Sequence, residues 1–427
     1  MNKLDTFILN ILNLNIDQII SIESYQKDGT VFARIVPKTS TDSCPYCGNK
    51  KIISKGYRDR KIKTMANNVC SCEIIYRIKR FTCKSCNVSF SDEHYIAPCN
   101  SRSSYYLITN VMNLLKNPEM TFKLVSTLLN VSSQTVIRIF DHYCKTAHIT
   151  LPEVICIDEV YTKNSDFDNS KYSCLIYDFY NKTLVDVTPS RKKEFLLNYL
   201  EKTYSQKERN NVKIVSMDMY ITYKNVAKLR FKNAIICVDS FHVIKALNDC
   251  VQNVRMRIIR LYETSSIEYY LLKQFKFLFL SSNINLDNYP RFNKRLNHYI
   301  NYRGLLELIL KIHPDLKKSY DLKETYILFN QEPHVVKEAL ISIHDFYNEF
   351  LESDIVELMP FVTILGNWDN EIANSFTVYK SRRISSGVAE SINSKVSSII
   401  YNSRGIRNSE RRKKRIMYVV NNKSSTL

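Results

Sequence analysis

The amino-acid sequence predicts a multidomain α+β protein, and three observations support this prediction. The chain has 427 residues, which is long for a single hydrophobic core. Two Cys-x-x-C pairs near the N-terminus predict a small module that is held together by a metal ion. Further along, short apolar runs alternate with amphipathic helical segments, as expected for strands that are joined by helical crossovers.

The composition favours a nucleic-acid partner and argues against a membrane protein. The formal net charge is +19 and the pI is about 9.3. Such an excess of cations attracts polyanions, although a soluble lysine-rich protein would share it. No uninterrupted apolar run reaches the length of a membrane span, and residues 1–5 lack the pattern of a secretory signal. Twelve cysteines in such a chain favour metal binding over disulfides.

Residues 1–36 are expected to form a small leading module. Leu4–Leu14 has apolar residues at helical spacing. Two β-favouring runs, Ile19–Tyr25 and Thr30–Val36, then flank Lys27-Asp28-Gly29. An Asp-Gly pair between two such runs predicts a tight β-hairpin.

Residues 37–100 are expected to form a zinc ribbon. Each Cys-x-x-C pair would make a tight knuckle, and four thiolates would close a tetrahedral Zn²⁺ site. The expected ligands are Cys44, Cys47, Cys83 and Cys86. The nearby competitors for these positions are Cys70, Cys72, His94 and Cys99, and four free thiols are the alternative. The basic residues between the two pairs either contact phosphate or form a solvated face.

Residues 101–147 have the pattern of a helix-turn-helix. A first helix is expected over 102–116, and two further helices over 121–140 meet at a turn, where Ser132 can cap the last helix. Gln134, Thr135 and Arg138 would then face the major groove, where the start of a recognition helix reads base edges. Any three-helix bundle can show the same pattern, so the motif by itself is weak.

Residues 150–260 have the strand and helix order of an α/β domain. Strands are expected at Val154–Val160, Lys171–Asp178, Thr183–Thr188, Val212–Met217 and Ala234–Val238, and helices at Lys192–Tyr204, Tyr220–Arg230 and from Phe241 onward. This order resembles the ribonuclease H-like fold. Residues 261–380 show helical spacing and no strand pattern, which predicts an all-helical insertion with its own packing.

Three carboxylates could meet in this domain. Asp158 comes at the end of the apolar run of a buried strand, Asp218 follows another strand, and Glu390 lies on the polar side of a helix within residues 381–427. Three carboxylates in one cleft suit a pair of Mg²⁺ (or Mn²⁺) ions, because hard cations take oxygen ligands, and the chemistry that follows is displacement at phosphorus. The simpler alternatives are a hydrogen-bonded buried acid, a strand-end cap and an exposed helix carboxylate, respectively.

The C-terminal tail is densely cationic. Its basic residues include Arg411, Arg412, Lys413 and Lys414. Such a run is either solvated or in contact with DNA phosphates.

Taken together, the motifs resemble the ISL-three insertion-sequence transposases, in which a zinc ribbon, a helix-turn-helix and a DDE catalytic domain occur in this order. The resemblance covers nearly the whole chain. It rests on Cys44-Pro45-Tyr46-Cys47-Gly48 with Cys83-Lys84-Ser85-Cys86, Ile157-Asp158-Glu159, Ser216-Met217-Asp218-Met219 with Tyr223, Val238-Asp239-Ser240-Phe241-His242-Val243-Ile244-Lys245 and Gly387-Val388-Ala389-Glu390-Ser391-Ile392-Asn393. Ser386 and Ser391 depart from the Asn and Gly that the family usually has around the last acid.

The resemblance implies a site and an activity. Asp158, Asp218 and Glu390 would be the DDE triad that holds Mg²⁺, and Asp239 with His242 would form an accessory D-x-x-H element. The activity would be cleavage of double-stranded DNA at the terminal inverted repeats of the element and joining of the 3′-hydroxyl to target DNA. Assembly on two ends implies a homodimer or a larger complex, in the nucleoid-containing cytoplasm of a prokaryote. A structure-specific nuclease, and a DNA-binding regulator without activity, are the rival interpretations.

Overall fold

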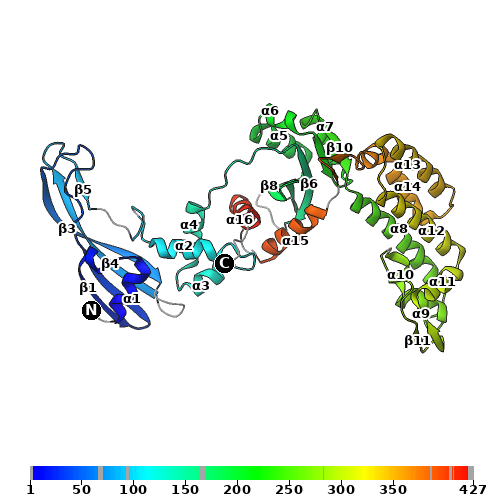
Figure 1. Cartoon of the computed structure of the whole chain (residues 1–427), viewed down its shortest axis with the longest axis horizontal. Helices are drawn as coiled ribbons and strands as arrows, with labels where there is room; N and C mark the ends of the chain where they lie inside the picture. The colour runs from blue at the N-terminus through cyan, green and yellow to red at the C-terminus, as the bar shows by residue number, and fades with distance from the viewer. Residues whose placement is uncertain are drawn as a thin grey trace. The chain divides into compact units, whose positions relative to one another are not determined.

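The computed structural model describes residues 3–65, 71–92, 96–99, 101–162, 170–281, 283–384, 387–402, 406 and 408–421, without the side chains of 65 and 387–391. The chain divides into two compact units (Figure 1). Unit 1 comprises Met1–Ala147 and Lys395–Leu427, and unit 2 comprises His148–Ser394. No described helix has the length and apolar character needed to cross a membrane.

Unit 1 contains a five-stranded sheet of order β1-β2-β4-β3, with β5 paired to β4. The strands are β1 (Ile19–Lys27), β2 (Thr30–Pro37), β3 (Ile52–Met65), β4 (Ser71–Cys83) and β5 (Ser89–Ser91), and they are preceded by α1 (Lys3–Leu12) and η1 (Ile16–Gln18). The predicted hairpin is confirmed: Asp28 and Gly29 have φ angles of 48° and 71°, as a two-residue type I′ turn requires.

The leading module and the cysteine module share this sheet. Strand β2 pairs in parallel with β4, so one continuous sheet includes residues on both sides of residue 37. Alternate residues of β4, such as Ile74 and Tyr76, are buried in one core with Ile8 and Leu9 of α1. Neither segment could bury its apolar face alone, which explains why the two modules are joined.

Four helices pack together in the rest of unit 1. They are α2 (Tyr105–Leu114), α3 (Phe122–Leu128), α4 (Ser133–Tyr143) and the C-terminal α16 (Ser409–Asn421). Phe140 of α4 is fully buried and meets Tyr418 of α16 edge to face, with 5.8 Å between ring centroids. The basic tail is therefore part of a packed helical core rather than a free extension.

Unit 2 is built on a second five-stranded sheet of order β10-β9-β6-β7-β8. The strands are β6 (Val154–Tyr161), β7 (Tyr172–Asp178), β8 (Thr183–Val187), β9 (Ile214–Met217) and β10 (Ile235–Val238), and the helices that follow them are α5 (Lys193–Thr203), α6 (Gln206–Asn211), α7 (Ile221–Arg230) and α8 (Ser240–Ile259). β6, β9 and β10 run parallel, and the meander β6-β7-β8 is antiparallel. All five predicted strands are present.

The remainder of unit 2 is mostly helical. It comprises α9 (Ile267–Gln274), α10 (Lys276–Leu280), α11 (Tyr302–Ile312), α12 (Pro314–Gln331), α13 (Val336–Leu351), η2 (Val356–Leu358) and α14 (Met359–Asn374). Long helix α8 leads from the sheet into this region (Figure 1). One apolar core runs from the sheet through α8 into these helices, so the insertion does not pack separately from the sheet.

The prediction that the insertion is all-helical is wrong in one respect. Arg291–Asn293 (β11) and His298–Ile300 (β12) form an antiparallel hairpin. A second small hairpin, Val378–Tyr379 (β13) with Arg382–Arg383 (β14), precedes α15 (Gly387–Asn402). Strands of two or three residues are too short to show the alternation of apolar and polar residues that indicates a strand.

Candidate active site and metal centre

The four cysteines meet at one point in unit 1. Cys44 and Cys47 lie before β3, and Cys83 and Cys86 lie around the end of β4. The Sγ atoms of Cys44 and Cys86 are 3.7 Å apart, and those of Cys47 and Cys83 are 3.6 Å apart. Four thiolates around Zn²⁺, at a Zn–S distance of about 2.3 Å, would be roughly 3.8 Å apart, so the geometry fits a tetrahedral zinc site.

Backbone N–H groups favour the thiolate form of Cys83. A hydrogen bond from the backbone N–H of Cys86 is the main reason that the pKa of Cys83 falls to about 6. Gly48 has a φ of 69°, which lets the chain turn immediately after Cys47. Of the sequence competitors, Cys72 is buried in the sheet core and Cys99 is outside the cluster, while Cys70 and His94 lie outside the described residues.

The strand register brings three aspartates to one edge of the unit 2 sheet. Ile157 of β6 pairs with Met217 of β9, and Met217 pairs with Val238 of β10. The next residue on each of these parallel strands is an aspartate: Asp158, Asp218 and Asp239. Carboxyl ends of parallel strands are where α/β sheets place their ligands.

Asp158 is held by a residue far away in sequence. The side-chain amide of Asn393, on α15, donates a hydrogen bond to the Asp158 carboxylate, and the Tyr177 hydroxyl donates to the Asn393 oxygen. The backbone N–H of Glu159 also donates to Asp158, at 2.6 Å. Burial raises the pKa of Asp158. These contacts fix the orientation of the carboxylate.

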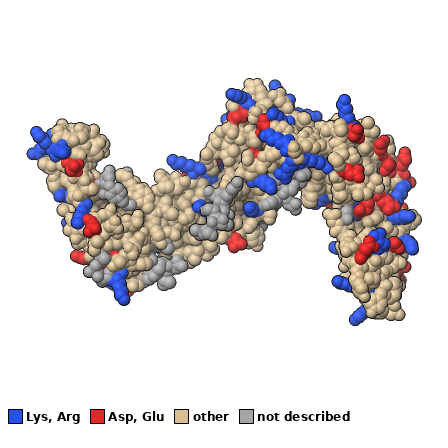
Figure 2. All heavy atoms as spheres, viewed as in Figure 1, with Lys and Arg blue, Asp and Glu red and all other residues tan. Residues whose placement is uncertain are grey.

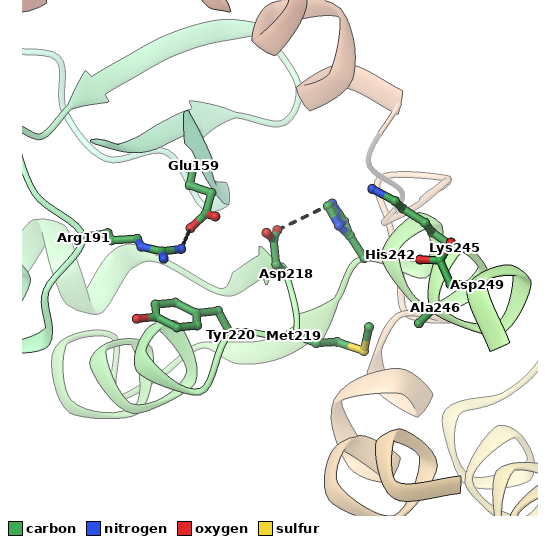
Figure 3. A pocket seen from close by; sticks show the side chains of 9 residues that line it. All are labelled: Glu159, Arg191, Asp218, Met219, Tyr220, His242, Lys245, Ala246 and Asp249. Carbon is green, nitrogen blue, oxygen red and sulfur yellow. Dashed lines mark hydrogen bonds and ion pairs between the residues drawn. The ribbon is translucent and has the colours of Figure 1, made fainter. Parts of the chain in front are cut away.

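Asp218 lines a pocket of about 260 Å³ together with Glu159, Arg191, Met219, Tyr220, His242, Lys245, Ala246 and Asp249 (Figure 3). His242 Nε2 is 3.7 Å from Asp218 and 3.9 Å from Asp239. Burial, followed by the negative charge of Asp158 and Glu159, raises the pKa of Asp218 to about 8. The site is therefore a concentration of negative charge that a cation would relieve.

Asp239 also caps the N-terminus of a helix. Its carboxylate accepts a hydrogen bond from the backbone N–H of Phe241 at 2.9 Å and caps the start of α8. His242 follows within the first turn of the same helix, so the expected D-x-x-H element lies beside Asp218.

Glu159 faces the opposite side of β6 from Asp158, as strand alternation requires. It forms an ion pair with Arg191, and the Tyr223 hydroxyl lies 3.5 Å from its carboxylate. The Arg191 guanidinium lies over the rings of Tyr172 and Tyr220, 4.1 Å and 4.7 Å from their centroids. Sequence reasoning missed Arg191, because it lies in the connection between β8 and α5, where no periodic pattern points to it.

The third expected acid, Glu390, lies outside the described side chains, although its backbone belongs to α15. Among the described residues, only the four cysteines form a group of three or more candidate ligands whose atoms lie within 4.8 Å of one another. The carboxylates of Asp158, Asp218 and Asp239 thus share a sheet edge without being drawn together to coordination distance. Asn393, which sequence reasoning did not single out, lies three residues after Glu390 in the same motif.

The predicted recognition helix has mixed exposure. Gln134 and Arg138 are exposed on α4, but Thr135 is buried, with 8% of its surface accessible. Its hydroxyl lies 2.9 Å from that of Ser132, the residue that caps the helix. Thr135 is therefore less accessible than Gln134 and Arg138, because the cap draws its side chain inward.

The basic tail residues also differ among themselves. Arg411 pairs with Asp141 of α4 at 2.7 Å, and Arg412 donates to the Ile406 carbonyl. Arg415 is buried and donates to the carbonyls of Asn117 and Met120. Lys413 and Lys414 are partly exposed. Several of these cations therefore hold α16 in place.

Two family models match the chain. Residues 40–86, which include all four clustered cysteines, match the zinc-finger of transposase IS204/IS1001/IS1096/IS1165. Residues 155–416 match the ISL3 family of DDE transposases, whose description is Transposase. Among curated proteins none matches.

The longer match spans more than half of the chain and includes the carboxylate edge of the sheet, which makes the protein an insertion-sequence transposase, an enzyme that processes DNA. It belongs to the ISL3 family, and it carries the zinc finger of such transposases at its N-terminus. The resemblance seen in the motifs is confirmed. A regulator without catalytic function is not favoured.

Proposed function

We propose that the protein binds the terminal inverted repeats of its own insertion sequence, cleaves the DNA there and joins the freed 3′-hydroxyl to target DNA. The observation that carries this proposal is the register of β6, β9 and β10, which aligns Asp158 and Asp218 at one sheet edge within the matched region. The strand order supports a ribonuclease H-like fold for this unit.

Asp158, Asp218 and Glu390 would hold two Mg²⁺ (or Mn²⁺) ions. The donor set fits, because carboxylate oxygens suit hard cations, and the pKa of Asp218 is raised first by burial and then by the negative charge of Asp158 and Glu159. Ions bound there would activate the attacking oxygen and stabilise the leaving oxygen of each displacement.

The other residues of the site would position these groups. Asn393 and Tyr177 orient the Asp158 carboxylate, and His242 lies beside Asp218 as an accessory residue. Arg191 and Lys245 line the same pocket and bring positive charge to where a DNA phosphate would enter.

DNA recognition would lie in unit 1. The four cysteines would hold structural Zn²⁺, and α3 and α4 would act as a helix-turn-helix that reads base edges through Gln134 and Arg138. Lys413 and Lys414 would contribute phosphate contacts. Two DNA ends in one complex would require two or more copies of the chain, acting in the cytoplasm of a prokaryote.

The experiment that tests this function is incubation of the purified protein with labelled DNA that spans one transposon end and its flank, with Mg²⁺ or Mn²⁺. The proposal predicts metal-dependent cleavage at the end, followed by joined products with target DNA. Cleavage without any joined product would instead identify a structure-specific nuclease.

A further inference from the structure

The β11–β12 hairpin in the insertion carries an exposed aromatic surface. Tyr289, Phe292 and Tyr299 are 87%, 49% and 71% exposed. Phe292 and Tyr299 are cross-strand partners, and their rings meet edge to face with 5.3 Å between centroids. Three large exposed rings within eleven residues mark an interaction surface more strongly than scattered single residues do.

The hairpin that carries these rings is firmly anchored. Asn293 is buried, and its side-chain oxygen accepts hydrogen bonds from the backbone of Arg295 and Leu296 at 3.0 and 3.2 Å. Its amide also donates to the Tyr270 hydroxyl of α9 at 3.2 Å. Leu296 and Ile300 pack against the core of unit 2. The inner side of the hairpin is therefore fixed, while the rings of Phe292 and Tyr299 stand on the outer side.

The charged residues of the hairpin itself have one sign. Between Asp287 and Glu307 the sequence has no acidic residue. The Asp287 carboxylate already accepts hydrogen bonds from Nε and Nη2 of Arg303. Arg291, Lys294 and Arg295 are exposed. No described acid forms an ion pair with any of these three cations. In the face shown in Figure 2, acidic atoms gather further along the insertion, over α12 and α13.

We propose that the β11–β12 hairpin binds DNA in which bases are unstacked, with Phe292 and Tyr299 stacking on exposed bases and Arg291, Lys294 and Arg295 contacting the backbone. Arg295 also lies over the Tyr270 ring, 5.1 Å from its centroid. Exposed rings next to cations that no described acid neutralises are the chemistry that recognises single-stranded nucleic acid. A purely phosphate-binding surface would need only the cations, and a protein-binding surface would gain little from a cationic rim without acids.

This inference rests on the proposed function, because DNA is the substrate and strands must separate locally where an end is cut. It gives the insertion a task of its own: binding an unpaired strand of the DNA that is being processed. The binding itself requires neither the carboxylates nor Mg²⁺, so it can be measured separately from catalysis.

The test uses the zinc-loaded full chain and a thymine 20-mer with one central 2-aminopurine, without divalent metal. Stacking on a ring quenches 2-aminopurine, and fluorescence anisotropy gives Kd. In Phe292→Leu/Tyr299→Leu, Kd should rise by about tenfold or more and the quenching should disappear, since a stacked base is worth about 1–3 kcal/mol and 1.4 kcal/mol is tenfold. In Phe292→Tyr/Tyr299→Phe both should persist.

Three controls separate this claim from others. Val356→Ala, at a 78% exposed position of the same insertion, should leave Kd and quenching unchanged. Gln134→Ala/Arg138→Ala should weaken duplex end binding but not binding to the 20-mer. An unchanged Kd and unchanged quenching in the leucine pair would overturn the proposal. So would a leucine pair that loses self-association in light scattering without DNA, because the surface would then be a contact between copies.

Discussion

At the scale of single residues, the site depends on how its carboxylates are held. Asn393 is the only described side chain seen to donate a hydrogen bond to the Asp158 carboxylate, and Tyr177 in turn supports Asn393. We predict that Asn393→Ala lowers DNA cleavage by about 10- to 100-fold, the usual cost of losing a residue that orients a metal ligand. Tyr177→Phe removes only the hydrogen bond that supports Asn393, so the cleavage rate should fall less than in Asn393→Ala. Cleavage assays with end DNA would measure both, and wild-type rates in Asn393→Ala would contradict the assigned role.

Sequence reasoning found the acids at this scale but not their partners. Asp158 and Asp218 are visible because an apolar strand gains nothing by ending in an acid. Asn393 lies 235 residues from Asp158 along the chain, and only the fold brings them together. Arg191 was missed because it lies in a loop, where no strand or helix spacing applies. The burial of Thr135 was missed because a contact with the capping residue Ser132 changes the exposure that helical spacing predicts.

At the scale of elements, the cysteine knuckles should control the folding of the N-terminal sheet. We predict that Cys44→Ser or Cys83→Ser releases about one Zn²⁺ per chain and weakens binding to end DNA, because metal binding and folding are coupled in such modules. Cys99→Ser is the matched control, since Cys99 lies near the site in sequence but outside the cluster. Metal analysis of the purified variants decides the matter, and unchanged zinc in both ligand variants would refute the assignment.

Helix α4 supplies a second prediction at this scale. Gln134→Ala and Arg138→Ala should reduce discrimination between transposon-end and random DNA, because base contacts give specificity worth about 1–3 kcal/mol each. Lys413→Ala/Lys414→Ala should weaken binding to both DNAs alike. Competition binding would measure the ratio, and an equal loss on both DNAs for Arg138→Ala would exclude α4 as the reading helix.

The C-terminal helix shows why charge read from sequence can mislead. A dense cationic run predicts either a solvated surface or a phosphate contact, yet Arg415 is 2% exposed and bonded to two backbone carbonyls. We predict that Arg415→Ala destabilises unit 1 by about 2 kcal/mol or more, because two buried carbonyls lose a charged donor. Lys414→Ala should change stability little. Thermal unfolding would distinguish them, and equal melting temperatures would argue against a structural role for Arg415.

At the scale of the whole molecule, segments that the sequence suggests are separate share sheets and cores. Cysteine spacing predicted the N-terminal zinc finger, and the alternation of strands and helices predicted the five strands of the unit 2 sheet. The leading hairpin nevertheless shares a sheet with the cysteine module, and the insertion shares its core with the catalytic sheet, because short segments bury apolar surface only against each other. The β11–β12 hairpin could not be predicted for a different reason: its strands are too short to show an alternating pattern in the sequence.

The central claim is that Asp158, Asp218 and Glu390 act together in metal-dependent DNA cleavage and joining. The most direct measurement compares wild type with Asp158→Asn, Asp218→Asn and Glu390→Gln on labelled end DNA with Mg²⁺, since an amide keeps the shape of the acid but loses the charge that holds the ions. Asp321→Asn is the control, because Asp321 is an exposed acid on α12 and does not line the carboxylate pocket. Each triad variant should bind end DNA but neither cut nor join it. An Asp218→Asn protein that still cleaves with Mg²⁺ would contradict the central claim.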